Sequence, residues 1–216
     1  MRAMILAAGR GERLRPITDA VPKSMVEVRG RRLIDRHLTM LARGGVDTVV
    51  INLDWLGEMI VEHVASGNRF GLNVVYSPEF GNVLETGGGI RRALSMLGED
   101  PFWVVNADIY TDFDLLPEPL DSSLEASLVL VPKPAHKNRG DFELEAGRIR
   151  NAEAPRYTFS GIARYRPSFF ANAPEGRYSV APMLRQAADA GTLGGSLYEG
   201  LWEDVGTPER LEMLNC

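Results

Sequence analysis

The sequence predicts an α/β protein whose central sheet is mixed but mainly parallel, with helices on both faces. Over the first 110 residues, short apolar runs alternate with longer segments in which apolar residues recur at helical spacing. Such alternation is typical of parallel strands joined by crossover helices. The second half has several short strand patterns with brief connections, which we expect to continue the same sheet. The 216 residues suffice for one domain with a full core.

The elements of the first half each have their own signal. Four short apolar runs predict buried strands at residues 4–8, 48–52, 72–76 and 102–105. Helical spacing follows three of these runs: first in Leu33, Ile34, His37, Leu38 and Leu41, then from Trp55, and last in a segment that Thr86 is expected to cap. Residues 9–24, rich in glycine, proline and arginine, predict a long functional loop.

The second half is less regular. Strand patterns occur at residues 126–131, 141–144, 148–151 and 161–165, and Val180, Met183, Leu184 and Ala187 indicate a helix. No linker or repeat interrupts the sequence.

Composition and charge narrow the classes of partner. The net charge of −5 argues against bulk attraction to nucleic acid or to an anionic membrane. Residues 1–32 nevertheless carry eight basic and three acidic residues, a local excess that suits a small anionic ligand. The single cysteine, Cys216, allows no internal disulfide, and no apolar run is long enough for a signal peptide or a membrane span. We expect a cytoplasmic protein.

The first chemical motif lies in the loop that follows the first strand. It reads Leu-Ala-Ala-Gly-Arg-Gly-Glu-Arg-Leu-Arg over residues 6–15, with Pro22 and Lys23 downstream. Gly9 and Gly11 allow a tight bend that brings backbone N–H groups against phosphate oxygens. Arg13 offers a fork of donors and Lys23 a mobile point charge, so the motif predicts a phosphate site.

Two better-known phosphate motifs do not fit this loop. A dinucleotide fingerprint needs glycine at its sixth position, where this chain has Leu14, and a helix directly afterwards, where Pro16 follows. A Walker loop needs lysine between glycine and Ser or Thr, and here Pro22 precedes Lys23.

A second group of residues is expected at the same edge of the sheet. Glu85, Thr86 and three glycines from Gly87 onward begin a helix, where exposed N–H groups and open space would suit a ligand. Asp108 follows the fourth strand, and Asp204 lies near the C-terminus. Taken singly, an aspartate in such a position is more often a helix cap or turn residue than a metal ligand. Two carboxylates together with phosphate oxygens and waters make a typical Mg²⁺ site.

The loop motif resembles that of the sugar-phosphate nucleotidyltransferases, whose hallmark is Leu-Ala-Ala-Gly-x-Gly-x-Arg-Leu/Met followed by Pro-Lys. The resemblance implies a Rossmann-like three-layer nucleotidyltransferase fold. It also implies an enzyme that joins an NTP to a sugar 1-phosphate and releases pyrophosphate. Catalytic roles would fall on Arg13, Lys23 and Asp108, nucleotide binding on Ala7, Ala8, Gly9, Gly11, Glu12, Arg13, Lys23, Glu85, Thr86 and Gly87, and Mg²⁺ binding on Asp108 and Asp204.

The second half matches the family less closely. Gly140, Asp141, Glu153 and Gly161 fall in the family's sugar-binding patterns, which implies a sugar-phosphate role for them. The lysine that members often use near the sugar phosphate is absent, because Ala154 occupies its position. Lys137, Arg139 and Arg156 are candidates to replace it.

The resemblance covers nearly the whole chain and implies a single domain over residues 1–216. Residues 1–110 would form the nucleotide-binding half, 111–200 the sugar-phosphate half, and 201–216 the second metal-ligand segment and a C-terminal helix. The most similar short members use UTP and N-acetylmuramate 1-phosphate in cell-wall recycling, which are the partners we expect, in a monomer.

Three alternatives remain at this stage. Related short enzymes take GTP with a heptose 1-phosphate, and others take CTP with phosphocholine. The third is a non-catalytic nucleotide-binding regulatory protein, since a fold alone does not give a function.

Overall fold

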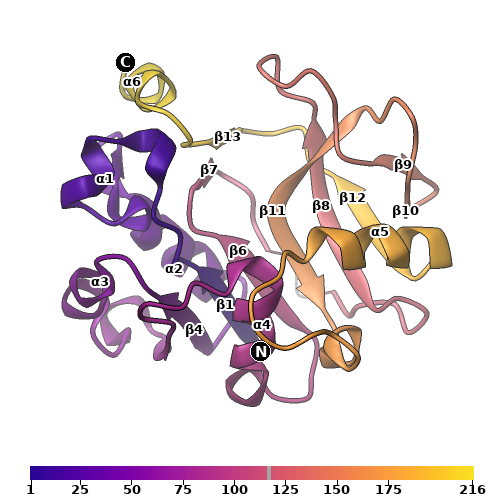
Figure 1. The fold of residues 1–216 in the computed structure, drawn as a ribbon, viewed down its shortest axis with the longest axis horizontal. Coiled ribbons are helices and arrows are strands. Elements are labelled where there is room, and N and C mark those ends of the chain that lie inside the picture. Colours follow the sequence, from indigo (N-terminus) through magenta and orange to yellow (C-terminus); the bar gives the residue numbers. More distant parts are fainter. Residues whose placement is uncertain (116–117) are drawn as a thin grey trace.

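A nine-stranded mixed sheet forms the centre of the computed structural model, which describes residues 1–115 and 118–216 (Figure 1). The strands run in the order β5-β4-β1-β6-β11-β8-β12-β10-β9. Their bounds are β1 Arg2–Leu6, β4 Thr48–Leu53, β5 Asn73–Pro78, β6 Phe102–Asn106, β8 Ala126–Pro132, β9 Glu143–Glu145, β10 Arg148–Arg150, β11 Tyr157–Tyr165 and β12 Leu193–Leu197. Two small ladders pair β2 (Glu27–Val28) with β3 (Arg31–Arg32) and β7 (Ile109–Thr111) with β13 (Trp202–Asp204).

Strand direction changes between the two halves of the chain. In this sheet β5, β4, β1 and β6 are parallel to one another, and β11 then lies antiparallel between β6 and β8. β12 is parallel to β8, and β10 and β9 complete the sheet in antiparallel pairings. The expected α/β fold with a mixed central sheet is confirmed, and the strands of the second half do continue the sheet of the first.

Helices cover both faces of this sheet. The α-helices are α1 Ile17–Ala20, α2 Leu33–Arg43, α3 Gly57–Val64, α4 Glu85–Leu97, α5 Ala181–Ala190 and α6 Pro208–Asn215, and the 3-10 helices are η1 Glu12–Leu14, η2 Lys23–Met25, η3 Asn68–Phe70 and η4 Pro167–Phe170. Ala3 and Ile5 of β1 face a core shared with α2 and α3, whereas Met4 faces a core shared with α4 and α5. Since successive strand residues point to opposite faces, burial of both faces requires the continuous apolar run seen in the sequence.

Three boundaries of the first half differ from the sequence-based prediction. The first strand ends at Leu6, because the N–H of Ala7 donates to the side chain of Asn52 (2.7 Å). The predicted loop over residues 9–24 contains the short helices η1, α1 and η2. The helix predicted to follow a Thr86 cap begins at Glu85, so Thr86 lies inside its first turn.

The pattern of the second half gave no sign of β12, whose sequence is Leu-Gly-Gly-Ser-Leu. Glycine is depleted in strands, so this segment lacks a strand signal. Packing explains the glycines: a Cβ at Gly194 would lie 2.5 Å from Leu124 Cδ1, and one at Gly195 would lie 2.4 Å from Ile149 Cδ1.

The last residues return to the first part of the chain. Figure 1 shows β13 crossing from the second half toward the N-terminal half, with α6 beyond it beside α1. A small buried cluster that includes Leu14, Val28, Tyr110, Val205 and Leu214 joins these segments. This return places Asp204 beside the turn that carries Asp108. In the described ranges, no helix has the length and apolarity needed to cross a membrane.

Candidate active site

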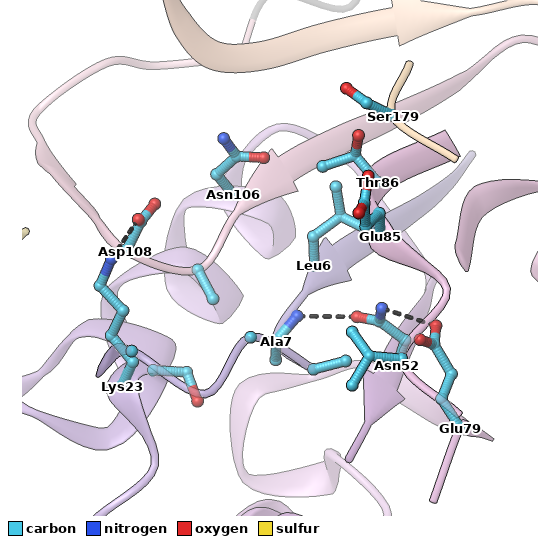
Figure 2. A pocket seen from close by; sticks show the side chains of 16 residues that line it. Leu6, Ala7, Lys23, Asn52, Glu79, Glu85, Thr86, Asn106, Asp108 and Ser179 are labelled. Carbon is cyan, nitrogen blue, oxygen red and sulfur yellow. Dashed lines mark hydrogen bonds and ion pairs between the residues drawn. The ribbon is translucent and has the colours of Figure 1, made fainter. Parts of the chain in front are cut away.

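Two adjoining cavities open at the carboxyl ends of the parallel strands, where ligands bind in open α/β sheets. The first, of about 380 Å³, is lined by seven of the predicted nucleotide-binding residues, as Figure 2 shows in part: Ala7, Ala8, Gly9, Gly11, Lys23, Glu85 and Thr86. The second, of about 610 Å³, adds Glu12 and Arg13 and shares Gly11 and Lys23 with the first. The structure therefore brings together two segments that lie about seventy residues apart in the sequence.

The glycine-rich loop is held in a fixed bend. Gly11 has φ +67°, in the left-handed region, and a Cβ there would lie 2.9 Å from Thr18 Cγ2. The hydroxyl of Thr18 donates to the carbonyl of Gly11 (2.8 Å), and Trp55 Nε1 donates to the carbonyl of Thr18 (2.8 Å). Glycine is required at position 11 for both its conformation and the space. The guanidinium of Arg10 lies 4.2 Å from the Trp55 ring centroid, a cation–π contact on the wall of the second cavity.

Lys23 links this loop to the turn after β6. Its Nζ lies 2.5 Å from Asp108 Oδ2, and the two side chains are 14% and 30% exposed. Both residues line the first cavity (Figure 2). A partly buried pair of this kind is screened less by salt than a surface pair, so it fixes the relative position of the two charges.

A buried hydrogen-bond network beneath the first cavity was not predicted. Asn52 Oδ1 accepts from the N–H of Ala7 (2.7 Å), and Asn52 Nδ2 donates to Glu79 Oε1 (2.9 Å). Glu79 Oε2 in turn accepts from the N–H of Leu84 (2.9 Å). Figure 2 draws the first two of these bonds, and all three together join the end of β1, the end of β4 and the start of α4. The available signals were Asn52, a polar residue at the end of the apolar run 48–52, and Glu79, three residues after the run 72–76.

Asp108 lies in the turn just before β7, and Asp204 ends β13, the strand that pairs with β7. Asp204 is paired with Ile109 in the β13–β7 ladder, and the N–H of Val205 donates to the carbonyl of Asp108 (2.8 Å). Arg210 forms an ion pair with Asp204, and His136 Nε2 lies 3.4 Å from its Oδ1. Arg13 approaches the same segment, since a Cβ at Gly206 would lie 3.5 Å from Arg13 Nη2. Asp108, Asp204 and Arg13, which the sequence predicted to act together, therefore lie at the same edge of the sheet.

The donor set here is compatible with Mg²⁺. Asp204 Oδ1 is buried and lies against Arg210, with which it forms an ion pair, and His136, so a metal ion bound here would share or replace these contacts. No cluster of three or more His, Cys, Asp or Glu side chains suited to a metal ion occurs among residues 1–115 and 118–216. Mg²⁺ is usually held by one or two carboxylates together with substrate phosphates and water, so two aspartates fit that mode of binding.

The three glycines at the start of α4 have a different role from the one predicted. The N–H groups of Gly87 and Gly88 donate to the carbonyl of Tyr178 (3.0 and 3.2 Å), so they are not available to a ligand. A Cβ at Gly87 would lie 2.2 Å from the Tyr178 ring, and one at Gly88 would lie 2.1 Å from the carbonyl oxygen of Gly176. The expected reason for these glycines is wrong: they admit another part of the same chain. Of the three residues predicted here, Glu85 and Thr86 line the first cavity and Gly87 packs behind it.

The residues predicted to bind the sugar phosphate are more dispersed. Gly161, with φ +85°, packs against Asn106, which lines the first cavity. Gly140 donates its N–H to the carbonyl of Pro155 (3.2 Å), and Asp141 Oδ2 accepts from the N–H of Phe159 (2.9 Å). Glu153 is exposed. The structure thus places Gly161 behind Asn106 of the cavity wall, and Gly140 and Asp141 in the backbone framework of the second half.

The three basic residues proposed for the missing lysine each contact another group. Lys137 Nζ lies 3.3 Å from Asp141, and Arg139 donates to the carbonyl of Ala152 (2.9 Å). Arg156 is bonded to Glu143, and these hydrogen bonds hold the pKa of the Glu143 carboxyl below its ordinary value.

Comparison with known proteins gives a consistent result along the whole chain. A family model described as "Nucleotidyl transferase" matches residues 2–216. An N-acetylmuramate alpha-1-phosphate uridylyltransferase of Neisseria meningitidis serogroup B is 42% identical, with 98% of this chain and 96% of that protein covered. A protein of the same name from Caulobacter vibrioides is 34% identical, with 96% and 92% covered.

Solved structures share the fold. A crystal structure of a Bacillus anthracis protein in complex with sucrose superposes with a TM-score of 0.89 at 21% identity, covering 100% of this chain and 94% of that one. The inositol-1-phosphate CTP transferase of T. maritima has a TM-score of 0.77 at 17% identity, covering 99% and 94%. With the full-length family match and the two relatives above 30% identity, these findings show that the chain belongs to the nucleotidyl transferase family.

Proposed function

We propose that the protein transfers the uridylyl group of UTP to N-acetylmuramate α-1-phosphate and releases pyrophosphate. The observation that carries this proposal is the convergence of the glycine-rich loop, Lys23 and Asp108 on one cavity at the strand ends. The two relatives above 30% identity, both named for that reaction, support the choice of substrates. This reaction would recycle a sugar recovered from the cell wall. It would take place in the cytoplasm, where UTP and sugar phosphates are found.

The first cavity suits a nucleoside. Leu6, Ala7 and Ala8 give it an apolar side, against which a base can pack. The buried Asn52–Glu79 network fixes the backbone around this side, so the pocket is formed before the ligand arrives. Gly9 and Gly11 bring the backbone of the loop close to the phosphates, where N–H groups and positive side chains can bind them.

The chemistry is an in-line displacement at the α-phosphorus. An oxygen of the sugar phosphate forms a new P–O bond, the bond to the β-phosphate oxygen breaks, and pyrophosphate leaves with the electron pair. The attacking phosphate is already anionic, so no side chain is needed to remove a proton from it. Arg13 and Lys23 bind the phosphate oxygens and offset their repulsion, and positioning with electrostatic stabilisation supplies most of the rate.

Asp108 and Asp204 would hold Mg²⁺, which when bound neutralises charge on the phosphate oxygens. Lys23, next to Asp108, orients that carboxylate in the free protein. Arg210, next to Asp204, does the same for the second carboxylate.

The test is a pyrophosphate-release assay with each of the four common NTPs against a panel of acceptors that includes N-acetylmuramate 1-phosphate, a heptose 1-phosphate and phosphocholine. We expect release only with UTP and N-acetylmuramate 1-phosphate. Release with GTP and the heptose, or with CTP and phosphocholine, would replace the proposed substrates. No release with any pair, together with nucleotide binding, would support a regulatory protein instead.

A further inference from the structure

A segment of the second half, residues 174–180, docks onto the start of α4. Tyr178 accepts hydrogen bonds from two N–H groups of the first helical turn through its carbonyl, and its own N–H donates to the carbonyl of Leu84 (3.1 Å). The N–H of Val180 donates to Thr86 Oγ1 (3.0 Å). The first-turn N–H groups of a helix otherwise lack partners, so these bonds attach the segment firmly. Gly87 and Gly88 leave the room that this contact needs.

Docking of this segment brings Arg177 to the active site. Arg177 lines the second cavity together with Arg10, Arg13 and Lys23. Those three cations come from the first 23 residues, whereas Arg177 comes from the second half of the chain. The cavity also contains the acids Glu12 and Asp54, and the N–H of Gly81 donates to Asp54 Oδ1 (3.0 Å).

Arg177 is held at the cavity rim by a carboxylate that is itself part of the site. Its Nε donates to Glu85 Oε1 (2.8 Å), and the arginine side chain is 68% exposed. Glu85 has φ +60°, a left-handed conformation that is unfavourable for a residue other than glycine. An exposed ion pair is weak, so a bound phosphate, with more charge and more acceptor oxygens, is the stronger partner for the guanidinium.

We propose that Arg177 is a substrate-binding residue that contacts a phosphate oxygen from the second-half side of the site. This inference rests on the proposed function, and if the phosphate is that of the acceptor, Arg177 supplies the cation that the sequence lacks at Ala154. Lys137, Arg139 and Arg156 each have another contact, and no residue of that group lines either cavity in the described part of the chain. The phosphate is either the triphosphate of UTP or that of the acceptor.

The test compares Arg177→Gln and Arg177→Lys with a matched control, Arg91→Ala. Arg91 forms an ion pair with Glu175 on the same docked segment (3.4 Å), yet it lies outside the lining of both cavities as the structure describes them. Two constants are measured for each variant: the Kd of UTP by calorimetry, and the KM of the acceptor at saturating UTP. Thermal unfolding of each variant checks that the fold is retained.

We expect Arg177→Gln to raise either the Kd of UTP or the KM of the acceptor at least about tenfold, as loss of a charge-assisted hydrogen bond does. Arg177→Lys should recover part of that loss, and Arg91→Ala should leave both constants within about twofold of wild type. A rise in the UTP Kd assigns the contact to the triphosphate, and a rise in the acceptor KM alone assigns it to the acceptor. If Arg177→Gln leaves both constants unchanged and the wild type is active, the role proposed for Arg177 is wrong and the proposed reaction stands. If the wild type itself is inactive, the proposed reaction is wrong.

Discussion

Lys23 Nζ and Asp108 Oδ2 lie 2.5 Å apart, although 85 residues separate them in the sequence. The contact joins the end of the glycine-rich loop to the turn after β6 at the mouth of the first cavity. In this position Lys23 holds the carboxylate of Asp108 before the substrate binds. If Mg²⁺ then pairs with Asp108, we expect Lys23 to be free to bind a phosphate.

Replacing either proposed metal ligand should reduce turnover strongly. We expect Asp108→Asn and Asp204→Asn each to lower kcat at least about 100-fold, the loss seen when one charge-stabilising group is removed from an active site. Pyrophosphate release under saturating substrates measures the effect. Asp100→Asn, at an exposed position, is the control and should match wild type. Near-wild-type kcat in either site variant would remove that residue from the metal site.

Removing divalent metal should abolish the reaction. Two carboxylates and the substrate phosphates make a site that binds Mg²⁺ only with substrate present, so a chelator should stop pyrophosphate release and excess Mg²⁺ should restore it. A titration of Mg²⁺ at fixed UTP gives the concentration for half-maximal rate. Asp204→Asn should raise that concentration, and a rate that survives chelation would contradict a metal-dependent mechanism.

The buried network centred on Asn52 should matter for both stability and nucleotide binding. Asn52→Leu leaves the N–H of Ala7 and one oxygen of Glu79 without partners, which costs about 2 kcal/mol of unfolding free energy. For a chain of this size that corresponds to a fall in Tm of about 4–8 °C. Because Ala7 lines the cavity, we also expect the Kd of UTP, measured by calorimetry, to rise.

The control for this variant is Ser77→Ala, two residues before Glu79. Ser77 is also fully buried, but its hydroxyl has no hydrogen-bond partner within the described residues, so its loss should cost less than about 1 kcal/mol. Equal destabilisation by the two variants, or an unchanged UTP Kd in Asn52→Leu, would show that the network does not position the nucleotide pocket.

The docking of residues 174–180 onto α4 leaves no room for a side chain at Gly88, so replacing Gly88 with alanine should disturb it. A Cβ at Gly88 would meet the carbonyl oxygen of Gly176 at 2.1 Å, a backbone atom that cannot rotate away. Gly88→Ala should therefore lower the free energy of unfolding by about 1–3 kcal/mol, even though alanine favours helix, and should displace Arg177 from the cavity. Urea unfolding and the constants measured for Arg177→Gln test both effects. Ser95→Ala, exposed on the same helix, should be neutral or slightly stabilising, and a Gly88→Ala protein that behaves like it would contradict the docking.

The sequence contained enough information for the fold of the first half and for the loop motif. Apolar runs identified β1, β4, β5 and β6. The runs of β1, β4 and β6 are nearly continuous because these strands are buried on both faces, whereas β5 lies at the edge of the sheet and is partly exposed. The rule that strand carboxyl ends share one edge placed Asp108 beside the loop before any coordinates were known.

Features that depend on contact between distant segments could not be predicted in the same way. The glycines of α4 and of β12 look like helix breakers or loop residues, and only the packing of Tyr178, Leu124 and Ile149 against them gives the reason. Arg177 carries no local motif at all. Its place in the cavity follows from docking of its segment onto α4, which involves residues about ninety positions away.

His37, which the helical spacing places on the apolar face of α2, should make the stability of the protein depend on pH. The side chain is buried, its Nε2 has no hydrogen-bond partner among the described residues, and burial lowers its pKa to about 4 from 6.5. Contact with the carbonyl of Ala107 and the charge of Asp108 oppose this shift, whereas Arg36 adds to it. The folded protein therefore holds His37 neutral at a pH where the unfolded chain has already bound a proton.

This difference in proton binding makes stability depend on pH in one direction. Between about pH 6.5 and pH 4 the unfolded state binds more protons, so the free energy of unfolding should fall as pH falls, by about 3 kcal/mol at most from this group. Urea unfolding at about pH 7 and about pH 4.5 measures the change for wild type and for His37→Leu. Carboxylates that titrate in the same range contribute to both proteins and cancel in the comparison. The variant should lose about 2–3 kcal/mol less than wild type on acidification, and equal losses would mean that His37 is protonated in the folded protein as readily as in the unfolded chain.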